Sequence, residues 1–180
     1  MTKKVLLWLV LLLPYLGLIF FWQYHTNEIA NIPNALFIVI SKEEMTLAMY
    51  DYKGKMLVKY PVACGKNLGD KLDKGDMKTP EGTFLISDIQ ESAHWTHDFG
   101  DGKGEIQGAY GPFFVRLLTP GHQGIGIHGT HNEESIGTRD TEGCIRMKNE
   151  DLEKFVKKIR VGNVVVITPS QFDVMNNLLN

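Results

Sequence analysis

The chain is poor in cysteine and has no excess of charge of either sign. Two of its 180 residues are cysteine, and 19 lysines and arginines are balanced by 21 aspartates and glutamates, for a formal net charge of −2. Internal repeats and low-complexity tracts are also missing. Nucleic-acid binding depends on Lys and Arg side chains that neutralise phosphates, and the sequence has no long basic stripe to provide them. We therefore expect no nucleic-acid partner.

The first residues differ from the rest in composition. Lys3 and Lys4 precede an uncharged, apolar run from Val5 to Trp22. As a helix this run would reach about 27 Å, close to the thickness of a bilayer's hydrocarbon core. A cleaved signal peptide has a shorter apolar region and a small-residue cleavage site, so we expect residues 1–27 to be a retained membrane anchor, with a cleaved signal as the alternative. The lysines favour a cytoplasmic N-terminus, which predicts a single-pass protein of the cytoplasmic membrane with its remaining chain outside the cytoplasm.

The remaining length allows one folded domain. Residues 28–35 are predicted to be a polar linker, and the roughly 140 residues that follow are enough to bury one core but not two. We expect the domain to cover residues 36–168 and residues 169–180 to form a C-terminal tail, with at most a weak helix.

Apolar runs bounded by turn residues predict a mainly β domain. One strong amphipathic helix is expected over Asn149–Ile159, with Asn149 as its N-cap. The segment 65–78 is too polar for a core strand and is predicted to be a loop. Residues 91–110 are glycine-rich and irregular, and we expect them to form a flap over a substrate cleft. The predicted strands are residues 36–40, 45–50, 56–63, 83–87, 112–118, 124–128 and 164–168.

One pair of residues suggests catalysis. Cys144 is a candidate nucleophile, but a thiol with its usual pKa of about 8.5 is only a few per cent thiolate at neutral pH and needs a base. His128, which precedes a glycine in a predicted core strand, is the candidate base, and it would later return the proton to the leaving amine. The alternative is structural, since a lone cysteine is commonly a small buried hydrophobe and a lone histidine is commonly a hydrogen-bonded structural residue.

The neighbours of this pair suit supporting roles. The carbonyl of Gly129 could accept the second imidazole N–H and fix the tautomer. Gly143 lets a substrate approach the backbone, so its amide and that of Cys144 could form an oxyanion hole, in which one donor contributes about 3 kcal/mol. Arg146 could bind a substrate carboxylate. Further substrate contacts are expected from Thr130, Thr141 and His131.

These two elements resemble the L,D-transpeptidase catalytic domain (YkuD) family, in which a His-Gly-Thr-like element precedes a Ser/Thr-x-Gly-Cys-x-Arg/Asn element by a similar interval. The resemblance extends from about residue 36 to residue 168, and its further landmarks, in order, are PVACG at 61–65, TPEGTF at 79–84 and GNVVVI at 162–167. It implies an L,D-transpeptidase-like β-sandwich with the cysteine at a cleft. By the same resemblance Cys144 is the nucleophile, His128 the base, Gly129 the carbonyl that orients it and Arg146 part of the catalytic element, and no cofactor or metal is expected.

The resemblance also implies acyl transfer on peptidoglycan stem peptides. Cys144 would attack the bond before the terminal D-Ala of a tetrapeptide stem, release D-Ala, and pass the acyl group of the thioester to an amine. The product would be a 3→3 cross-link or an attached protein. With water as the acceptor, the same Cys/His site would make the protein an L,D-carboxypeptidase or endopeptidase, and this alternative stays open.

Two positions depart from the family pattern. Glu142 stands where many members have histidine, and a carboxylate turned toward the thiol would oppose thiolate formation, so we expect Glu142 to be exposed to solvent. Cys64 stands where serine or threonine is common, and we expect a buried strand thiol. A Cys64–Cys144 disulfide, which would block the nucleophile, is the alternative.

Two other classes of protein compete with this prediction. A metalloenzyme would use several of the histidines, but their spacings match no familiar zinc motif, and we expect two of them to lie in the flap. A non-catalytic wall-binding module would leave Cys144 dispensable. The histidines concerned are His94, His97, His122, His128 and His131, of which the first two belong to the predicted flap.

Overall fold

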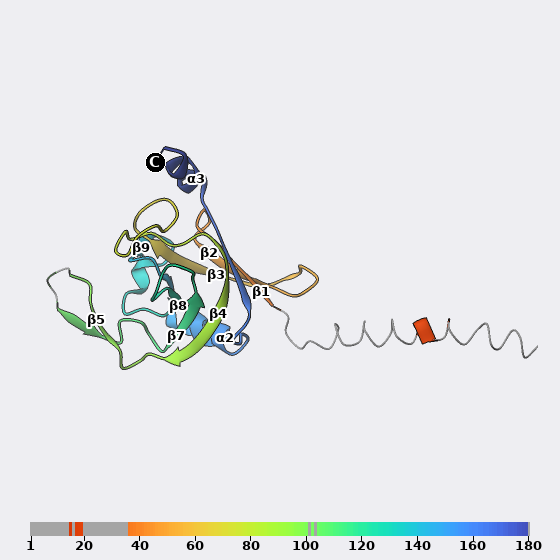
Figure 1. The fold of residues 1–180 in the computed structure, drawn as a ribbon. Coiled ribbons are helices and arrows are strands. Elements are labelled where there is room, and N and C mark those ends of the chain that lie inside the picture. Colours follow the sequence, from red (N-terminus) through yellow and green to blue (C-terminus); the bar gives the residue numbers. More distant parts are fainter. Residues whose placement is uncertain (1–14, 16, 20–35, 101, 103, 180) are drawn as a thin grey trace, which may run out of the picture. The chain divides into compact units, whose positions relative to one another are not determined.

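The computed structural model describes residues 15, 17–19, 36–100, 102 and 104–179 (Figure 1). The chain divides into two compact units, Met1–Ala35 and Leu36–Asn180. Among the described residues, no helix is long and apolar enough to cross a membrane. The predicted anchor at 1–27 lies outside the described residues except for 15 and 17–19, and the predicted linker at 28–35 lies wholly outside them.

The second unit is built on one nine-stranded sheet. Its strands follow the order β10-β8-β7-β4-β11-β1-β2-β3-β9, and an additional pairing between β10 and β3 closes the sheet on itself. The predicted mainly β fold is therefore confirmed, and these nine strands form one continuous sheet. The strands are β1 Phe37–Ser41, β2 Thr46–Tyr50, β3 Met56–Gly65, β4 Gly82–Glu91, β7 Phe113–Leu118, β8 Gly126–His128, β9 Arg139–Thr141, β10 Ile145–Met147 and β11 Val164–Thr168.

The core follows from the alternation of side chains along these strands. On β1, Ile38 and Ile40 are fully buried, and they lie opposite the buried Val165 and Ile167 of β11, its parallel neighbour. Because successive side chains of a strand point to opposite faces, this register gathers the apolar residues on one side of the sheet. The helix α2, Asn149–Val156, adds Leu152 and Phe155 to the same core.

The structure corrects the predicted N-cap and end of α2. The cap position is Lys148, without a side-chain capping bond, and the helix ends at Val156. The Asn149 side chain accepts from the Thr130 amide and donates to the Thr130 carbonyl, at 2.8 and 2.9 Å. A residue that satisfies two backbone groups of a distant segment cannot also cap its own helix, so a tertiary contact overrides the local capping preference.

The predicted irregular flap contains a short hairpin, β5 Thr96–Asp98 paired with β6 Glu105–Gln107, which projects from the closed sheet (Figure 1). The strand β4 is longer than predicted and runs to Glu91. Between His128 and Cys144 the chain forms the 3-10 helix η1, Glu133–Ser135, and the strand β9, neither of which was predicted.

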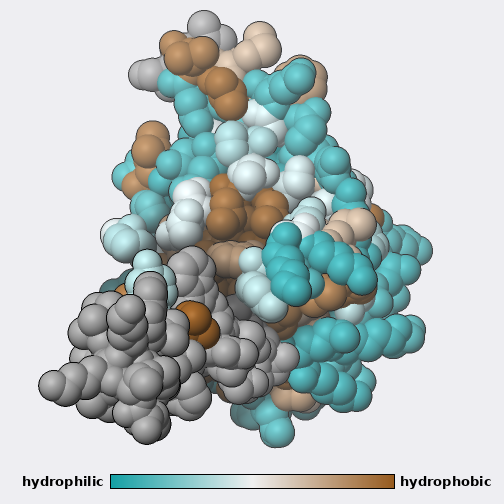
Figure 2. All heavy atoms as spheres, turned by 90° about the vertical axis from the view of Figure 1, so that its right-hand side faces the viewer, coloured by the Kyte–Doolittle hydropathy of each residue, from teal (hydrophilic) through white to brown (hydrophobic). Residues whose placement is uncertain are grey.

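The tail forms the helix α3, Gln171–Leu179. Its Asp173 is fully buried, whereas Phe172, Met175 and Leu178 are exposed. Figure 2 shows the resulting hydrophobic side chains at the top of the molecule, over this helix.

Candidate active site

The predicted base ends one strand, and the predicted nucleophile directly precedes the neighbouring strand. The parallel pairing of β8 with β10 puts His128 opposite Arg146 and Ile127 opposite Ile145, and Cys144 directly precedes β10. Ile127 and Ile145 are fully buried in the core. By the alternation of side chains, His128, Cys144 and Arg146 belong to the opposite face of the sheet, where a cleft of about 840 Å³ contains all three.

Loops from both ends of the sheet complete the cleft. One wall comes from the loop before β4, a second from the turn between β7 and β8, and a third from the hairpin and the segment after it. Besides the three residues above, the lining includes Lys71, Lys74, Gly75, Met77, His97, Phe99, Tyr110, Arg116, Gly121, His122, Gln123, Gly124, Ile125, Thr141 and Glu142.

His128 is held as a neutral base. Its Nδ1 lies 2.6 Å from the carbonyl oxygen of Gly129. Because a carbonyl can only accept, Nδ1 carries the proton and Nε2 is left with the free electron pair. Burial lowers the pKa of His128 to about 3, although the Gly129 hydrogen bond acts in the opposite direction. The imidazole is therefore uncharged at neutral pH.

Cys144 is held as a thiol. Its Sγ donates to the carbonyl oxygen of Gly124 at 3.3 Å. Burial and, less strongly, the negative charge of Glu142 raise the pKa of Cys144, while a backbone hydrogen bond at Gly126 and the charges of Lys71 and Arg116 lower it, and the net value is about 11. The pair thus rests in its neutral form, and proton transfer has to accompany the attack of sulfur on a substrate.

An aromatic stack fixes the His128 ring. The Phe114 ring is parallel to it, with 5.6 Å between centroids and 5° between planes, and the Tyr110 ring meets it edge-on at 4.9 Å. Phe114 stands opposite His128 in the β7–β8 register, and a side chain at Gly126 would clash with the Phe114 ring. These rings were not predicted from the sequence. Gly126, two residues before the histidine, is the one hint in the sequence, because it leaves room for the Phe114 ring.

A second arrangement fixes the backbone beside His128. Gly129 donates its N–H to the Tyr110 carbonyl at 2.8 Å, and Asn149 holds both backbone groups of Thr130. A side chain at Gly129 would clash with the Asn149 amide oxygen and with Gly111. Gly129 is therefore required for close packing as well as for its carbonyl, and Asn149 is a further residue that sequence reasoning did not place at the site.

The turn before Cys144 is organised by Thr141. Its hydroxyl donates to the Cys144 carbonyl at 2.6 Å and accepts from the Gly143 amide at 3.2 Å. Gly143 has φ +129°, and a Cβ there would lie 2.6 Å from the Lys78 carbonyl oxygen, so no other residue fits. The Gly143 amide, which was predicted for the oxyanion hole, thus donates to the Thr141 hydroxyl. Thr141, which was predicted to contact substrate, is buried, organises the turn and borders the cleft.

The other predicted substrate contacts separate into two groups. Arg146 borders the cleft but is 4% exposed, and its Nη1 donates to Ser135 and to Asp140 at 2.7 and 2.8 Å. Its Nε is the one buried side-chain nitrogen or oxygen without a hydrogen-bond partner among the described residues. Thr130 instead bonds the Asn132 backbone, and His131 packs against Phe99. Neither of the last two belongs to the described lining of the cleft, and their role as substrate contacts stays a prediction.

The sequence model of the L,D-transpeptidase catalytic domain family, YkuD, matches residues 35–167. The chain belongs to this family. A putative L,D-transpeptidase YkuD from Bacillus licheniformis is 33% identical over 132 residues, which cover 73% of this chain and 65% of that protein. A putative L,D-transpeptidase YqjB from Bacillus subtilis is 31% identical over 149 residues, covering 82% and 77%.

A solved structure of the helical cell shape determining protein Pgp2 from Campylobacter jejuni superposes with a TM-score of 0.56 at 26% identity. The match covers 76% of this chain and 48% of that one, so this chain corresponds to about half of the solved relative. The L,D-transpeptidase fold is thus shared, and the family is one of acyltransferases that act on peptidoglycan.

Two residues that depart from the family pattern have defined places. Glu142 is exposed, as predicted, and its carboxylate pairs with Nε2 of His97 at 3.1 Å, which links the hairpin to the nucleophile's turn. Cys64 is a fully buried strand thiol, as predicted. Both cysteines are free, so the alternative of a Cys64–Cys144 disulfide is wrong for this structure.

The histidines do not gather into a metal site within the part of the chain that the structure describes, where no group of three or more His, Cys, Asp and Glu side chains could hold an ion. His97 lies on β5 of the flap hairpin, while His122 and His128 border the cleft from other segments. The arrangement of this L,D-transpeptidase domain instead brings together one thiol and one imidazole.

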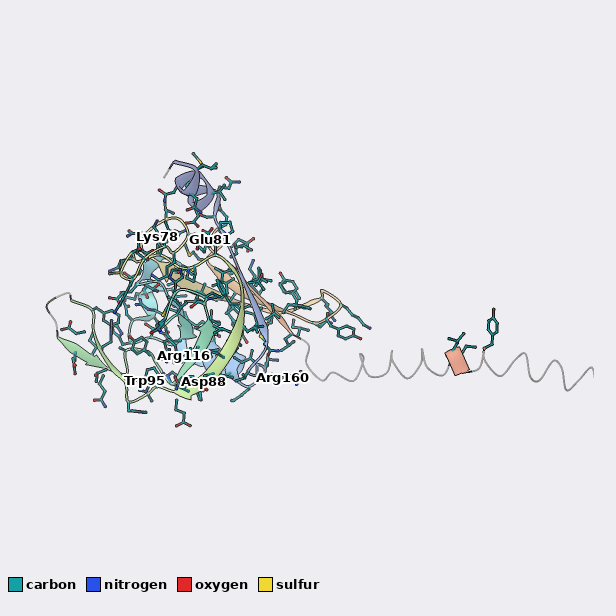
Figure 3. All side chains as sticks on the ribbon, in the orientation of Figure 1. Lys78, Glu81, Asp88, Trp95, Arg116 and Arg160 are labelled. Atoms are coloured by element: carbon teal, nitrogen blue, oxygen red, sulfur yellow. The ribbon has the colours of Figure 1, made fainter. Side chains whose placement is uncertain are left out.

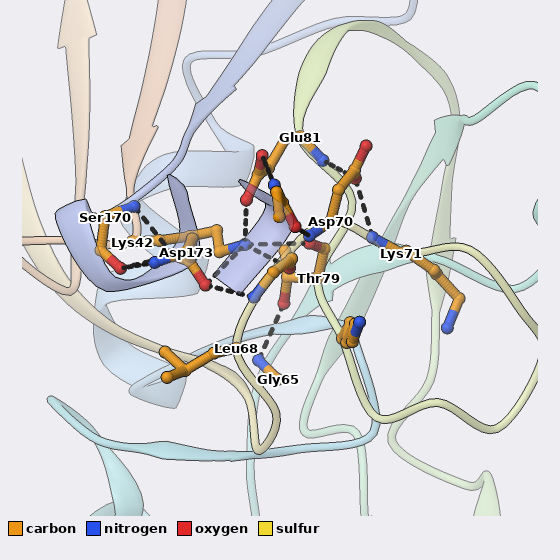
Figure 4. Close-up of polar contacts among 12 residues, drawn as sticks. Lys42, Gly65, Leu68, Asp70, Lys71, Thr79, Glu81, Ser170 and Asp173 are labelled. Carbon is orange, nitrogen blue, oxygen red and sulfur yellow. Dashed lines mark hydrogen bonds and ion pairs between the residues drawn. The ribbon is translucent and has the colours of Figure 1, made fainter. Parts of the chain in front are cut away.

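A buried ionic cluster supports the cleft wall formed by residues 66–81. Lys42 is fully buried and pairs with Glu81 at 2.7 Å and with Asp173 of α3 at 3.3 Å (Figure 4). Asp173 also accepts from the Gly69 amide at 2.6 Å and from Arg139 at 2.8 Å. Because Arg139 begins β9, which leads to the nucleophile, Asp173 connects the wall loop with the segment that carries Cys144.

Proposed function

We propose that this protein is a cysteine-dependent L,D-transpeptidase that acts on peptidoglycan tetrapeptide stems. The observation that carries the proposal is the hydrogen bond from His128 Nδ1 to the Gly129 carbonyl, because it leaves Nε2 unprotonated in the cleft that also contains Cys144. A neutral base beside a neutral thiol suits a reaction in which the proton moves only when sulfur attacks.

The proposed acylation uses the groups as they rest. The Cys144 sulfur bonds to the carbonyl carbon before the terminal D-Ala while its proton passes to Nε2 of His128. When the tetrahedral intermediate collapses, the C–N bond breaks and His128 returns the proton to the amine of D-Ala. The products are a neutral imidazole, free D-Ala and a thioester on Cys144.

Deacylation is the reverse sequence with a different nitrogen. An acceptor amine attacks the thioester, its proton passes to His128, and the C–S bond breaks as Cys144 regains a proton. A 3→3 cross-link or an attached protein results. Water in place of the amine would give L,D-carboxypeptidase or endopeptidase activity at the same residues, so the acceptor is decided by what the cleft admits.

The place of action is part of the same proposal. The apolar run from Val5 to Trp22 would anchor the chain in the cytoplasmic membrane, with the domain on the side that faces the wall. The similarity to the cell shape determining protein supports a role in wall remodelling.

The test is covalent capture of the nucleophile. The full-length protein in detergent is incubated with a carbapenem and its intact mass is measured. We expect one adduct that disappears in Cys144→Ala and persists in Cys64→Ala, the matched control at the chain's other cysteine. An adduct that survives Cys144→Ala would refute the assignment, and loss of activity with a chelator would favour a metalloenzyme.

Transfer and hydrolysis are separated with a tetrapeptide substrate. The peptide is incubated with and without an amine acceptor, and the products are identified by mass. We expect a cross-linked product with the acceptor present. A tripeptide as the sole product under both conditions would assign the protein to the hydrolytic alternative.

A further inference from the structure

A second, smaller pocket adjoins the catalytic cleft. It has a volume of about 400 Å³ and shares Tyr110, Arg116 and Gly124 with the cleft, while Trp95 and Phe114 complete its aromatic wall. Figure 3 labels Trp95 and Arg116, which lie near each other in that view. The Gly124 carbonyl also accepts the hydrogen bond from the Cys144 thiol, so the nucleophile lies at the boundary between the two pockets.

Within the described part of the chain, Arg116 is a cation without an anionic partner. It is half-buried on β7, its guanidinium lies 5.1 Å from the centre of the Phe114 ring, and one Nη donates to Gln90 at 3.1 Å. Arg139 and Arg146 each pair with an aspartate, whereas Arg116 forms no ion pair among the described residues. Asp88 stands opposite it on β4, but its Oδ1 accepts from the Ile89 amide. The ring and the amide hold the guanidinium in place, and donors remain for a ligand.

The strand register places Arg116 beside the reaction. Arg116 pairs with Gly126 across β7 and β8. Continued one residue beyond the Ile145–Ile127 pair, the β8–β10 register brings Cys144 to the other side of Gly126. Two strand spacings separate the backbones by about 10 Å. Both side chains belong to the face that borders the cleft, and the glycine between them contributes no side chain.

This separation matches the span of one amino acid beyond the scissile bond. Consecutive Cα atoms are about 3.8 Å apart, so one residue beyond the attacked carbonyl fits between the strand positions that carry Cys144 and Arg116. Arg and carboxylate form paired, charge-assisted hydrogen bonds. The positive charge of Arg116 also favours the thiolate form of Cys144, in agreement with their proximity.

We propose that Arg116 binds the C-terminal carboxylate of the residue that leaves. Arg116 is then a specificity-determining residue that selects peptides ending one residue beyond the attacked bond, and the aromatic wall accommodates the apolar side of that residue. This inference rests on the proposed function and adds to it the group that recognises the leaving residue.

The test compares a tetrapeptide with its C-terminal amide in the full-length protein. Wild type, Arg116→Met and Arg116→Lys are assayed for release of the last residue, and kcat/KM is determined for each peptide. We expect the kcat/KM of wild type to be about 10- to 100-fold higher for the free acid than for the amide, as for a hydrogen bond between charged groups. In Arg116→Met the kcat/KM for the acid should fall to that for the amide, which should not change. Arg116→Lys should recover part of it.

Lys74→Met is the matched control, because Lys74 is an exposed cation that borders the same cleft. Lys74→Met should change kcat/KM by the same factor for both peptides and leave the acid-to-amide ratio of kcat/KM unchanged. Equal cleavage of acid and amide by wild type, or an unchanged ratio in Arg116→Met, would overturn the inference. A third peptide, amidated at a side-chain carboxylate, tests whether Arg116 binds that carboxylate and not the C-terminal one. If amidating the side chain removes the effect of Arg116→Met on kcat/KM, the C-terminal assignment is wrong.

Binding separates the failure of this inference from failure of the proposed function. The dissociation constants of acid and amide are measured with Cys144→Ala and with Cys144→Ala/Arg116→Met, which require no turnover. We expect tighter binding of the acid only when Arg116 is present, and equal binding would overturn the inference. Labelling of Arg116→Met by iodoacetamide at Cys144 but not at the buried Cys64 checks that the variant is folded, and carbapenem capture by wild type judges the proposed function alone.

Discussion

Two buried polar regions of this domain treat charge in opposite ways. At the cleft, His128 is buried and Cys144 is half-buried, and neither forms an ion pair among the described residues. Loss of hydration moves their pKa values to about 3 and about 11, so both groups are neutral. In the ionic cluster, Lys42 and Asp173 are fully buried but pair with each other, and Lys42 also pairs with Glu81 and Asp173 with Arg139.

The comparison shows that burial alone does not decide a residue's charge state. A buried ionisable group stays neutral when its surroundings offer only backbone and aromatic contacts, and it stays charged when an opposite charge and several hydrogen bonds compensate for lost hydration. The neutral pair at the cleft is available for proton transfer, and the ionic cluster fixes the position of loops. Variants at the cleft should therefore change mainly the reaction rate, and variants at the ionic cluster should change mainly the free energy of unfolding.

The largest expected effect is on the reaction. Replacing His128 with Gln removes the base but leaves a polar side chain beside the Gly129 carbonyl. We expect the rate of acylation of Cys144 to fall by about 10²- to 10⁴-fold, the range for loss of a general base. Stopped-flow measurement with a carbapenem gives the rate, and a decrease below tenfold would contradict the role of His128.

The largest expected effect on stability lies at the ionic cluster. Lys42→Met leaves the Asp173 and Glu81 carboxylates without their buried cation, and breaking a buried pair costs about 3–5 kcal/mol. The matched control is Lys59→Met, because the Lys59–Glu44 pair is exposed and an exposed pair contributes at most about 1 kcal/mol. Urea unfolding followed by circular dichroism measures both free energies, and equal losses would refute the comparison.

The two regions should lose stability in different ranges of pH. His128 has a pKa of about 3 in the folded protein against an ordinary value of 6.5, so the unfolded chain binds the proton first and stability declines as pH falls from about 6.5 toward 3. Burial raises the pKa of Asp173, but bonds from Ser170 and Gly69 and the charge of Lys42 outweigh it and bring the pKa to about 2, below the ordinary 3.8.

Asp173 therefore contributes stability above about pH 4 that is lost as pH falls toward 2. Urea unfolding across this pH series is the measurement. We expect His128→Gln to remove the decline between pH 6.5 and 4, and Asp173→Asn to reduce the change below pH 4. A decline above pH 4 that persists in His128→Gln would show that other groups cause it.

The smallest expected effect concerns the carboxylate beside the thiol. Glu142→Gln removes a charge that raises the pKa of Cys144, so the rate of alkylation by iodoacetamide near neutral pH should increase by about two- to fivefold, less than one pKa unit. His97→Gln removes the imidazole that contacts Glu142 but keeps the carboxylate, and it serves as the control. An equal increase in both variants would assign the effect to the hairpin and not to charge.

Much of the architecture could be predicted because it depends on local patterns. The strands β1, β2, β7 and β11 were expected within one or two residues, since alternating apolar side chains reveal a half-buried strand. The hairpin in the flap and the strands β9 and β10 were missed. Each is only three residues long, too short for such a pattern.

The site could be predicted only in part. The glycines beside His128 and Cys144 drew attention to both residues, whereas Asn149 was expected to cap a helix and instead holds the Thr130 backbone. Its partner lies far away in the chain, so no local preference could reveal the contact. The same reason applies to the His97–Glu142 pair and to the three segments that meet at Lys42.

The sequence by itself determined the mainly β fold, the thiol and imidazole, and the family to which they point, because these depend on side-chain chemistry and on order along the chain. Only the tertiary structure decided that the pair rests neutral, that Phe114 and Tyr110 fix the imidazole, and that Arg116 borders the cleft with no ion pair to any described residue. Burial and strand register set those properties, and both arise when distant segments come together.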